Sequence, residues 1–146
     1  MRCPACSALL QTITVQTNEA DSLEVEICSQ GCGGLWLDRF ELKKVDEKHE
    51  QLGARLIALS SQAKGELLPG SRKRMCPKCS NTVLHRHFSS IQRSIEVDEC
   101  PGCAGIWLDQ GELASLRQEY PTEAERQQAA ELYLSRMLKA AIHQAR

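Results

Sequence analysis

Aromatic residues are scarce in this chain, and long hydrophobic runs are absent. Aromatic side chains make up 4% of the 146 residues, so no single large core is evident. No stretch approaches the roughly 18 apolar residues of a membrane span, and the first residues lack the charged and then apolar pattern of a secretory leader. We therefore expect a cytoplasmic protein with no membrane partner.

Motifs of the common enzyme classes are also missing. The sequence has no phosphate-binding loop, no Ser/His/Asp arrangement and no open metal site with a general base. Its eight cysteines fall into two sets of four, which leaves none over as a catalytic thiol. We therefore predict a protein that is not an enzyme and has no small-molecule substrate.

The most informative feature is a pattern that occurs twice. In each copy a Cys-Pro-x-Cys pair precedes a strand-like stretch, a second cysteine pair and the motif Gly-x-Trp-Leu-Asp-x-x-Glu-Leu. Four thiolates in two close pairs are typical of a closed, tetrahedral structural zinc site. We therefore predict one zinc ion in each copy and two in the chain. The predicted ligands are Cys3, Cys6, Cys28 and Cys32 in the first copy and Cys76, Cys79, Cys100 and Cys103 in the second.

Other uses of eight cysteines remain open from the sequence. A small secreted chain can place them in disulfides, a rubredoxin-like cage can hold iron, and a Cys-x-x-Cys pair can be a redox dithiol. A redox dithiol is expected near a βαβ pattern, whereas both Cys-Pro-x-Cys pairs lead into hairpin-like sequence. Zinc is the interpretation that we favour. Because zinc binding in such sites contributes on the order of 10–16 kcal/mol, each ribbon should lose its fold without metal.

Each copy also carries the signals of a β-hairpin. Leu10 to Thr17 and Leu23 to Ile27 alternate apolar and polar side chains around a polar turn, and the second copy repeats this in Thr82 to Phe88 and Ile91 to Val97. The predicted fold class is a small metal-bound α+β protein with two zinc ribbons. Each ribbon consists of a β-hairpin and two cysteine knuckles, and each is followed by a helix.

The motif after the second cysteine pair of each copy, here called the exit knuckle, predicts how the ribbon joins its helix. Asp38 and Asp109 stand three residues before a glutamate, which is the spacing of a capping box. We predict that both carboxylates accept backbone N–H bonds at the start of a helix. Trp36 and Trp107 are expected to pack between hairpin and helix, with an exposed stacking or partner-binding role as the alternative.

Two apolar stripes predict long helices. The first has heptad-like spacing and consists of Leu42, Val45, His49, Leu52, Leu56, Leu59 and Ala63. The second follows a capping box at Thr122 and Glu125 and consists of Ala130, Tyr133, Leu134, Met137, Leu138 and Ala141. We expect the stripes to pack together within one chain or across a dimer, with His49 as a packed or snorkelling side chain.

These features divide the chain into four segments. Residues 1–42 are the first zinc ribbon, and residues 43–71 are a long amphipathic helix and linker. Residues 72–113 are the second zinc ribbon, and residues 114–146 form a C-terminal helical segment.

The motifs carry a family resemblance. The second copy, with Cys-Pro-Gly-Cys-Ala-Gly-Ile-Trp-Leu-Asp-Gln-Gly-Glu-Leu after its hairpin, resembles the small prokaryotic zinc ribbons called transcription-factor-IIB-type zinc fingers (zf-TFIIB). The resemblance covers Arg2 to Leu42 and Met75 to Leu113. The first copy differs in a wider exit knuckle, which is expected to bulge around Gly31, and in Arg39-Phe40 where the second has Gln110-Gly111. The resemblance implies that all eight cysteines bind zinc, and it implies a nucleic-acid-binding or transcription-related role.

Positive charge is concentrated in the second ribbon. The formal net charge of the chain is −1, and it falls to about −5 when each quartet holds zinc as a tetrathiolate of charge −2. The candidate nucleic-acid-binding residues are Arg72, Lys73, Arg74, Lys78, Arg86 and Arg93, with His85, His87 and Phe88 nearby. The alternative is that these cations compensate the negative charge of the zinc centre.

Two functional hypotheses follow. One is a non-enzymatic tandem zinc-ribbon protein that acts as a nucleic-acid-binding or transcription-related regulatory module through its second ribbon. The alternative is a protein–protein interaction adaptor that uses rigid ribbons and amphipathic helices to bind a partner or a second copy. The acidity of the chain favours the adaptor, whereas the family resemblance favours the nucleic-acid role.

Overall fold

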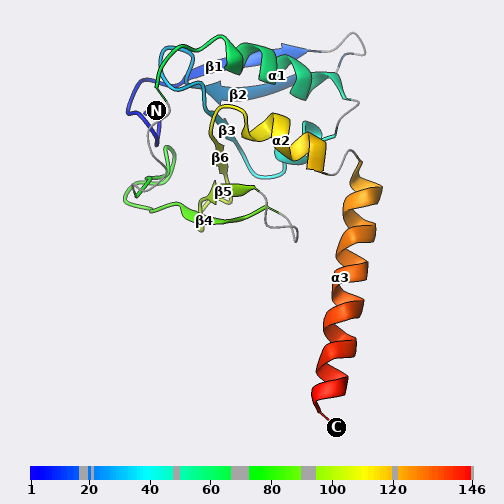
Figure 1. Ribbon diagram of the computed structural model, residues 1–146. Helices are drawn as coiled ribbons and strands as arrows, with labels where there is room; N and C mark the ends of the chain where they lie inside the picture. Colours follow the sequence, from blue (N-terminus) through cyan, green and yellow to red (C-terminus); the bar gives the residue numbers. More distant parts are fainter. Residues whose placement is uncertain are drawn as a thin grey trace.

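The two ribbons form one continuous antiparallel sheet. The computed structural model describes residues 1–16, 20, 22–47, 50–66, 73–89, 95–119 and 122–145, and within them six strands lie in the order β1-β2-β3-β6-β5-β4 (Figure 1). The first ribbon supplies β1 (Gln11–Gln16), β2 (Ser22–Ile27) and β3 (Leu35–Leu37). The second supplies β4 (His85–Phe88), β5 (Glu96–Glu99) and β6 (Ile106–Leu108). From either edge of the sheet to its centre, the first, second and third strands of one ribbon follow in turn. The two ribbons are therefore related by an approximate two-fold symmetry.

Both predicted hairpins are confirmed, although residues 17 and 91–94 of the predicted strands lie outside the described residues. In the first hairpin, β1 pairs with β2 so that Val15 lies opposite Leu23 and Ile13 opposite Val25. Val15, Leu23 and Val25 turn toward the core because alternate residues of a strand share one face. In the second hairpin, β4 pairs with β5 from His85 opposite Glu99 to Phe88 opposite Glu96. The four residues of β4 are all exposed at the edge of the sheet.

The two halves meet at β3 and β6. These short strands pair antiparallel and bring Trp36 opposite Trp107 at the middle of the sheet. Both indoles are completely buried. They belong to one cluster with Leu84 and with buried cysteines of both quartets, so a tryptophan pair separates the two metal sites. The prediction that the tryptophans are core residues is confirmed, but their packing surface is the other ribbon.

The first predicted long helix is wrong, because it is interrupted before its middle. A short 3₁₀ helix, η1 (Leu42–Lys44), ends at Lys44, and the α-helix α1 begins only at Gln51 and ends at Ser61. Arg117, from a helix of the second half, donates to the carbonyl oxygens of Val45 and Glu50. A side chain therefore takes carbonyl groups that a continuous helix would use internally.

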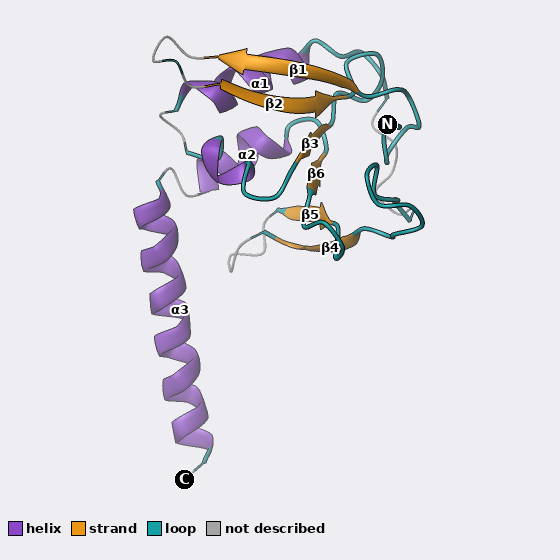
Figure 2. Ribbon diagram, turned by 180° about the vertical axis from the view of Figure 1, so that it is seen from behind, coloured by secondary structure: helices purple, strands orange, loops and turns teal. Residues whose placement is uncertain are grey.

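The start of α1 is built around that arginine. Glu50 caps the helix by accepting the Gly53 N–H at 2.8 and 3.0 Å, and it also pairs with the Arg117 guanidinium. A Cβ added at Gly53 would lie 2.0 Å from Arg117 Nη1, so only glycine allows this approach. The helix buries Leu52 and Leu56 and runs along β1 and β2 (Figure 2).

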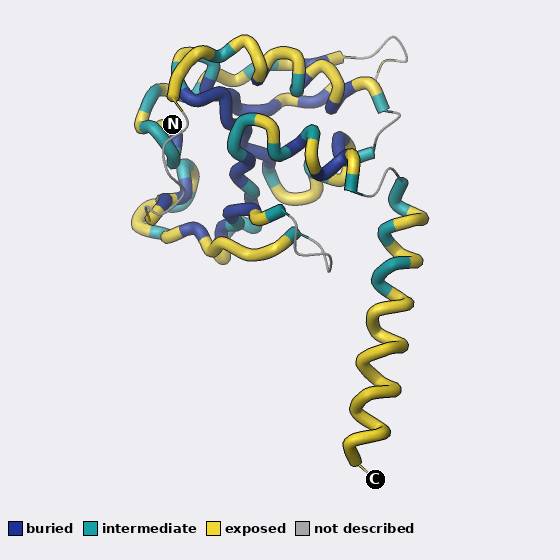
Figure 3. The backbone as a smooth tube through the Cα atoms, viewed as in Figure 1, coloured by how far each residue is buried: buried dark blue, intermediate teal, exposed yellow. Residues whose placement is uncertain are grey.

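The last two helices differ sharply in their surroundings. Helix α2 (Glu112–Glu119) packs against α1 and buries Leu113 and Leu116. Helix α3 (Glu123–Gln144) starts at the predicted capping box, where Thr122 Oγ1 accepts the Glu125 N–H at 3.2 Å. It then projects away from the sheet and has no buried residue (Figures 1 and 3). Packing of the two apolar stripes within one chain is therefore a wrong prediction. His49 lies outside the described residues.

Candidate metal centres

The first cysteine quartet has the spacing of a tetrahedral metal site. The four sulfur atoms of Cys3, Cys6, Cys28 and Cys32 all lie within 4.8 Å of one another. Cys3 and Cys32 sulfurs are 3.5 Å apart, and those of Cys6 and Cys28 are 3.4 Å apart. Tetrahedral zinc with Zn–S bonds near 2.3 Å needs sulfur atoms about 3.8 Å apart. The donor set is therefore already gathered at nearly the distance that zinc requires.

The second quartet repeats this arrangement. The sulfur atoms of Cys76, Cys79, Cys100 and Cys103 lie within 4.8 Å of one another, and the Cys76–Cys103 distance is 3.8 Å. None of the eight cysteines, all of which are described, forms a disulfide. The sulfur atoms stand well beyond the S–S bond length of about 2.05 Å, at distances that fit a shared metal ion.

Backbone N–H groups donate hydrogen bonds to several of the cysteine sulfur atoms. Cys3 accepts N–H bonds from Ala5 at 3.4 Å and Cys6 at 3.3 Å, and Cys76 accepts equivalent bonds in the second ribbon. Cys100 accepts from Gly102 and Cys103. Burial opposes ionisation of Cys100, yet these two amides and the neighbouring thiols lower its pKa to about 7. Such N–H···S bonds stabilise the thiolate, which is the form that binds metal.

Comparison with known proteins agrees with this geometry. The family model described as transcription factor zinc-finger matches residues 2–48 and 75–119, which together include both quartets and both Trp-Leu-Asp motifs. The chain belongs to this family. Searches of curated proteins and of solved structures found no match. The chain is thus a tandem zinc ribbon with two Cys₄ sites that each fit one Zn²⁺.

The two sites of this zinc-finger protein differ in how they are covered. Gly31 lies directly on the first site, because an added Cβ would stand 2.7 Å from the sulfur atoms of Cys28 and Cys6. The chain after α1 crosses over this knuckle, where Gly65 donates its N–H to the Gly31 carbonyl at 2.9 Å. The corresponding Gly102 of the second site has only ordinary contacts. The first site is thus the more enclosed of the two.

The aspartates of the Trp-Leu-Asp motifs have a different role from the one predicted. Asp38 Oδ1 accepts the indole N–H of Trp36 at 3.1 Å, and Asp109 Oδ1 accepts that of Trp107 at 2.9 Å. Among the described residues, neither carboxylate accepts a backbone N–H at a helix start. Instead, the glutamates reach back, and Glu112 Oε2 accepts the Asp109 N–H at 2.7 Å. The carboxylates satisfy buried tryptophans, which removes the cost of an unpaired indole N–H.

The interior of the second ribbon contains a charged network that the sequence did not reveal. Arg74 is 4% exposed and forms two parallel bonds of 2.9 and 3.0 Å to the Asp109 carboxylate. It also contacts Asp98 at 2.7 Å, and Arg86 pairs with the other oxygen of Asp98 at 3.0 Å. Burial acts against the charge of Arg74, but Asp109 and Asp98 raise its pKa, so the guanidinium stays charged.

The corresponding carboxylates of the first ribbon lie next to a lysine of the second ribbon. The first ribbon's counterparts of Asp98 and Asp109 are Glu26 and Asp38, and the residue at the position of Arg74 is Met1. Lys78 of the second ribbon reaches across to pair with Asp38 and lies 3.8 Å from Glu26. Burial raises the pKa of Glu26, and Lys78 counteracts this rise. The ion pair between Lys78 and Asp38 therefore joins the two ribbons, in addition to the pairing of β3 with β6.

The candidate phosphate-binding residues are therefore not gathered on one free basic face. Arg74 is buried, while Lys78 and Arg86 are exposed and paired with carboxylates. Lys73 is exposed, as are His85, His87 and Phe88 on β4. Arg72 and Arg93 lie outside the described residues. Arg74, Lys78 and Arg86 pair with carboxylates, a role that the sequence did not predict. Compensation of the zinc centre by these cations stays a prediction.

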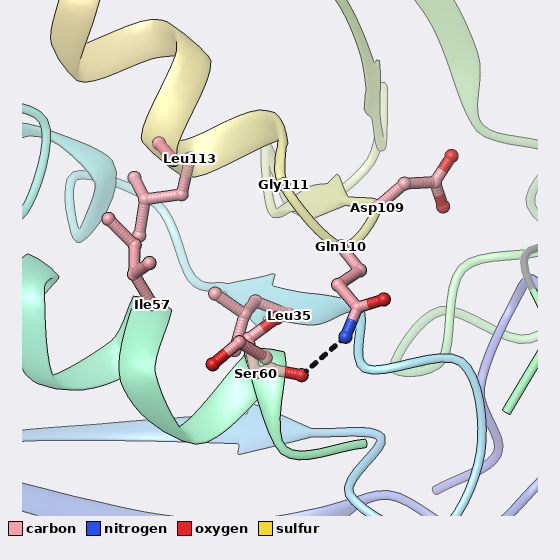
Figure 4. Close-up of a pocket in the computed structure, with 9 residues that line it drawn as sticks. Leu35, Ile57, Ser60, Asp109, Gln110, Gly111 and Leu113 are labelled. Atoms are coloured by element: carbon pink, nitrogen blue, oxygen red, sulfur yellow. Dashed lines mark hydrogen bonds between the residues drawn. The ribbon is translucent and has the colours of Figure 1, made fainter. Parts of the chain in front are cut away.

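A small cavity lies where α1 meets the start of α2. It measures about 90 Å³ and is lined by apolar side chains that include Leu35, Ile57 and Leu113 (Figure 4). Gln110 closes one side by donating to the Ser60 carbonyl oxygen at 2.7 Å. The carboxylate of Asp109 is turned away from this cavity and is held by Arg74. The cavity thus lies at a contact between the two halves of the protein.

Glu112 makes the stability of the protein depend on pH. Burial raises the pKa of Glu112 to about 7, although the Asp109 N–H lowers it, from an ordinary value of 4.5. Between these values the folded state binds more protons than the unfolded state, so stability falls as pH rises toward about 7. Between pH 6 and 7, we expect the free energy of unfolding of the zinc-loaded wild type to fall relative to that of Glu112→Gln. Above pH 7 the two free energies should change with pH in the same way.

Chemical denaturation of the zinc-loaded proteins from pH 6 to 8 measures this difference. Glu112→Gln keeps an oxygen acceptor for the Asp109 amide, so the substitution removes the titration and retains the contact. Glu131→Gln on exposed α3 is the control, and it should follow the wild-type curve. Identical pH dependence of wild type and Glu112→Gln would contradict the prediction.

Proposed function

We propose that this zinc-ribbon protein is a non-enzymatic, transcription-related regulatory module that works by binding another protein chain through α3. One observation carries the proposal: a 22-residue helix stands away from the sheet with no buried residue. Its apolar side chains are between 38% and 64% exposed. Those on the proposed binding side are Tyr133, Leu134, Met137, Leu138 and Ile142, whereas Leu132 lies on the opposite side of the helix. A surface of this kind is typical of a helix that packs against a protein partner.

The rest of the molecule supports this role by serving as a rigid base. Two zinc sites, the tryptophan pair and the shared sheet hold the body in one unit. Arg126, in the first turns of α3, pairs with Asp46, which is 4% exposed in the body. This ion pair ties the start of α3 to the body, while residues 131–145 are exposed. The family to which the chain belongs supports the transcription-related part of the proposal.

A second candidate function is nucleic-acid binding by the second ribbon. The family description favours it, and so do the exposed His85, His87 and Phe88 of β4, with Lys73 also exposed. Of the described candidate cations, Arg74, Lys78 and Arg86 pair with carboxylates, so affinity would respond only shallowly to salt. Each phosphate neutralised on duplex DNA contributes a slope of about −0.9 in log affinity against log salt. An oligonucleotide titration over a salt series measures this slope, and charge reversal at Arg2 is the control for reversal at Lys73.

We also propose a reducing, cytoplasmic location for the protein. All eight cysteines are free and fit zinc sites, and thiols persist in this form where disulfides are kept reduced. Among the described residues, no helix combines the length and the apolar character needed to cross a membrane.

Affinity capture from native extract separates the two functions. Full-length protein is used as bait, with and without nuclease treatment, beside a variant carrying Leu134→Glu and Leu138→Glu. We expect a specific co-purifying protein that survives nuclease and is lost with this variant. Leu132→Glu, at an equally exposed residue on another side of α3, is the control and should retain the partner. Capture that depends on nucleic acid and ignores the α3 substitutions would favour the second candidate.

A further inference from the structure

We infer that α3 binds the α3 of a second copy of this chain, with the two helices antiparallel. This inference rests on the proposed function, in which α3 is the protein-binding element, and it names the partner. Three features of α3 support it: the order of its seam residues, the distribution of its charges and its position relative to the body.

The seam of α3 reads nearly the same in both directions. The residues at alternating steps of three and four are Gln127, Ala130, Leu134, Met137, Ala141 and Gln144. When two copies run antiparallel about a two-fold axis between residues 135 and 136, each layer joins similar side chains. Gln127 then meets Gln144 of the second copy, Ala130 meets Ala141, and Leu134 meets Met137. Such a self-complementary patch is what a two-fold dimer requires.

Charge selects the antiparallel direction. Glu125 and Glu131 lie in the first half of α3, whereas the second half carries Arg136 and Lys139 and no acidic residue. Glu123 and Arg126 pair with each other at 2.8 Å. An antiparallel pair places the acidic half of one helix beside the basic half of the other, while a parallel pair places like charges together. Glu125 and Lys139 lie on the face of α3 away from the seam, so the attraction acts at longer range between the two halves, and it favours the first arrangement.

The position of α3 favours the same direction. The helix leaves the body at its first turns and extends freely from there (Figure 2). In a parallel pair both bodies would have to occupy the space around the same end. In an antiparallel pair each body lies at an opposite end, and the free part of each helix packs along the other. Pairing would cover the seam side of α3, most of which lies within the exposed residues 131–145.

The available area predicts a reversible dimer. Tyr133 and Leu138 flank the seam and are 38% and 64% exposed, and Leu134 and Met137 within it are 60% and 54% exposed. Together with two alanines they offer roughly 500 Å² in each copy, or about 1,000 Å² for the pair, at the lower limit of specific interfaces. We therefore expect dimerisation that depends on concentration in the micromolar range.

Sedimentation velocity of the purified, zinc-loaded full chain over a concentration series tests the inference. We expect wild type to shift from monomer to dimer, and Leu134→Glu or Met137→Lys each to weaken dimerisation by at least about tenfold, since each buries a charge in the seam. Leu132→Glu is the matched control, because Leu132 is 55% exposed on the opposite side of the helix and should leave the dimer intact.

Mixing the two charged variants tests the direction. In the antiparallel pair, Glu at residue 134 faces Lys at residue 137 of the other copy, so an equimolar mixture should recover dimer that neither variant forms alone. Wild type that stays monomeric at hundreds of micromolar would overturn the inference. So would equal loss of dimer in Leu132→Glu, or a mixture of the variants that remains monomeric. Capture of another protein by monomeric chain would leave the proposed function standing while this inference fails.

Discussion

Removing zinc is expected to unfold the whole sheet. Each zinc contributes on the order of 10–16 kcal/mol to such a fold, which matches or exceeds the roughly 5–15 kcal/mol that stabilises a typical domain. The buried cluster around the metal sites consists mainly of cysteines and the two tryptophans, so this part of the core depends on zinc. A separate aliphatic cluster that includes Val25, Leu56 and Leu108 stays available without metal, but it does not hold the cysteine knuckles in place. Strands β3 and β6, which join the halves, are each only three residues long.

Titration with a strong chelator, followed by far-ultraviolet circular dichroism and amide NMR spectra, measures this effect. We expect dispersed amide signals to collapse on zinc removal and to return when zinc is added. Cys28→Ser should also weaken the second ribbon, because the sheet is continuous across both halves. Ser80→Ala, at an exposed residue beside Cys79, is the control. An apoprotein with a native-like dispersed spectrum would contradict the prediction.

Substitution of Gly34 by alanine is expected to disrupt the joint between the ribbons. An added Cβ would stand 2.1 Å from Cζ2 of Trp107, and Gly105 is related to Trp36 in the same way at 2.1 Å. Both tryptophans are fully buried in paired strands, so neither ring can move aside without loss of packing. Such overpacking costs about 1–3 kcal/mol or more, and Trp107→Ala should cost about 3–5 kcal/mol.

A double-mutant cycle separates the clash from other effects. In the Trp107→Ala background, Gly34→Ala should cost far less than it does in wild type, because the obstructing ring is gone. Gly102→Ala is the control, since its added Cβ would meet sulfur atoms only at 3.4 and 3.6 Å. Unfolding midpoints of the zinc-loaded proteins in denaturant provide the free energies. Strictly additive costs would show that Gly34 and Trp107 are not in contact.

The sequence by itself determined the features that depend on residue type and short spacing. Cysteine pairs with two or three residues between them specify the metal sites, since a zinc ion needs four thiolates and the knuckles supply them in pairs. Alternating side chains specified both hairpins, and Thr122 with Glu125 specified the start of α3. In each case the interacting groups are near in the chain or the chemistry of the residue admits few alternatives.

The tertiary structure decided the features that depend on distant partners. Arg117 lies 72 residues from Val45, and its bonds to the carbonyls at the start of α1 interrupt a heptad pattern that local sequence extends back to Leu42. Arg74 was predicted to face phosphate, but Asp98 and Asp109 hold it in the interior.

The pairing of the two ribbons likewise could not be predicted from the local sequence pattern. Each copy carries a glycine two residues before its tryptophan, yet only the pairing of β3 with β6 shows that each glycine makes room for the other ribbon's indole. Periodicity describes which residues share a face of one element, whereas it does not say which surface will cover that face. For α1 that surface is the sheet, and for α3 no other part of the described chain covers it.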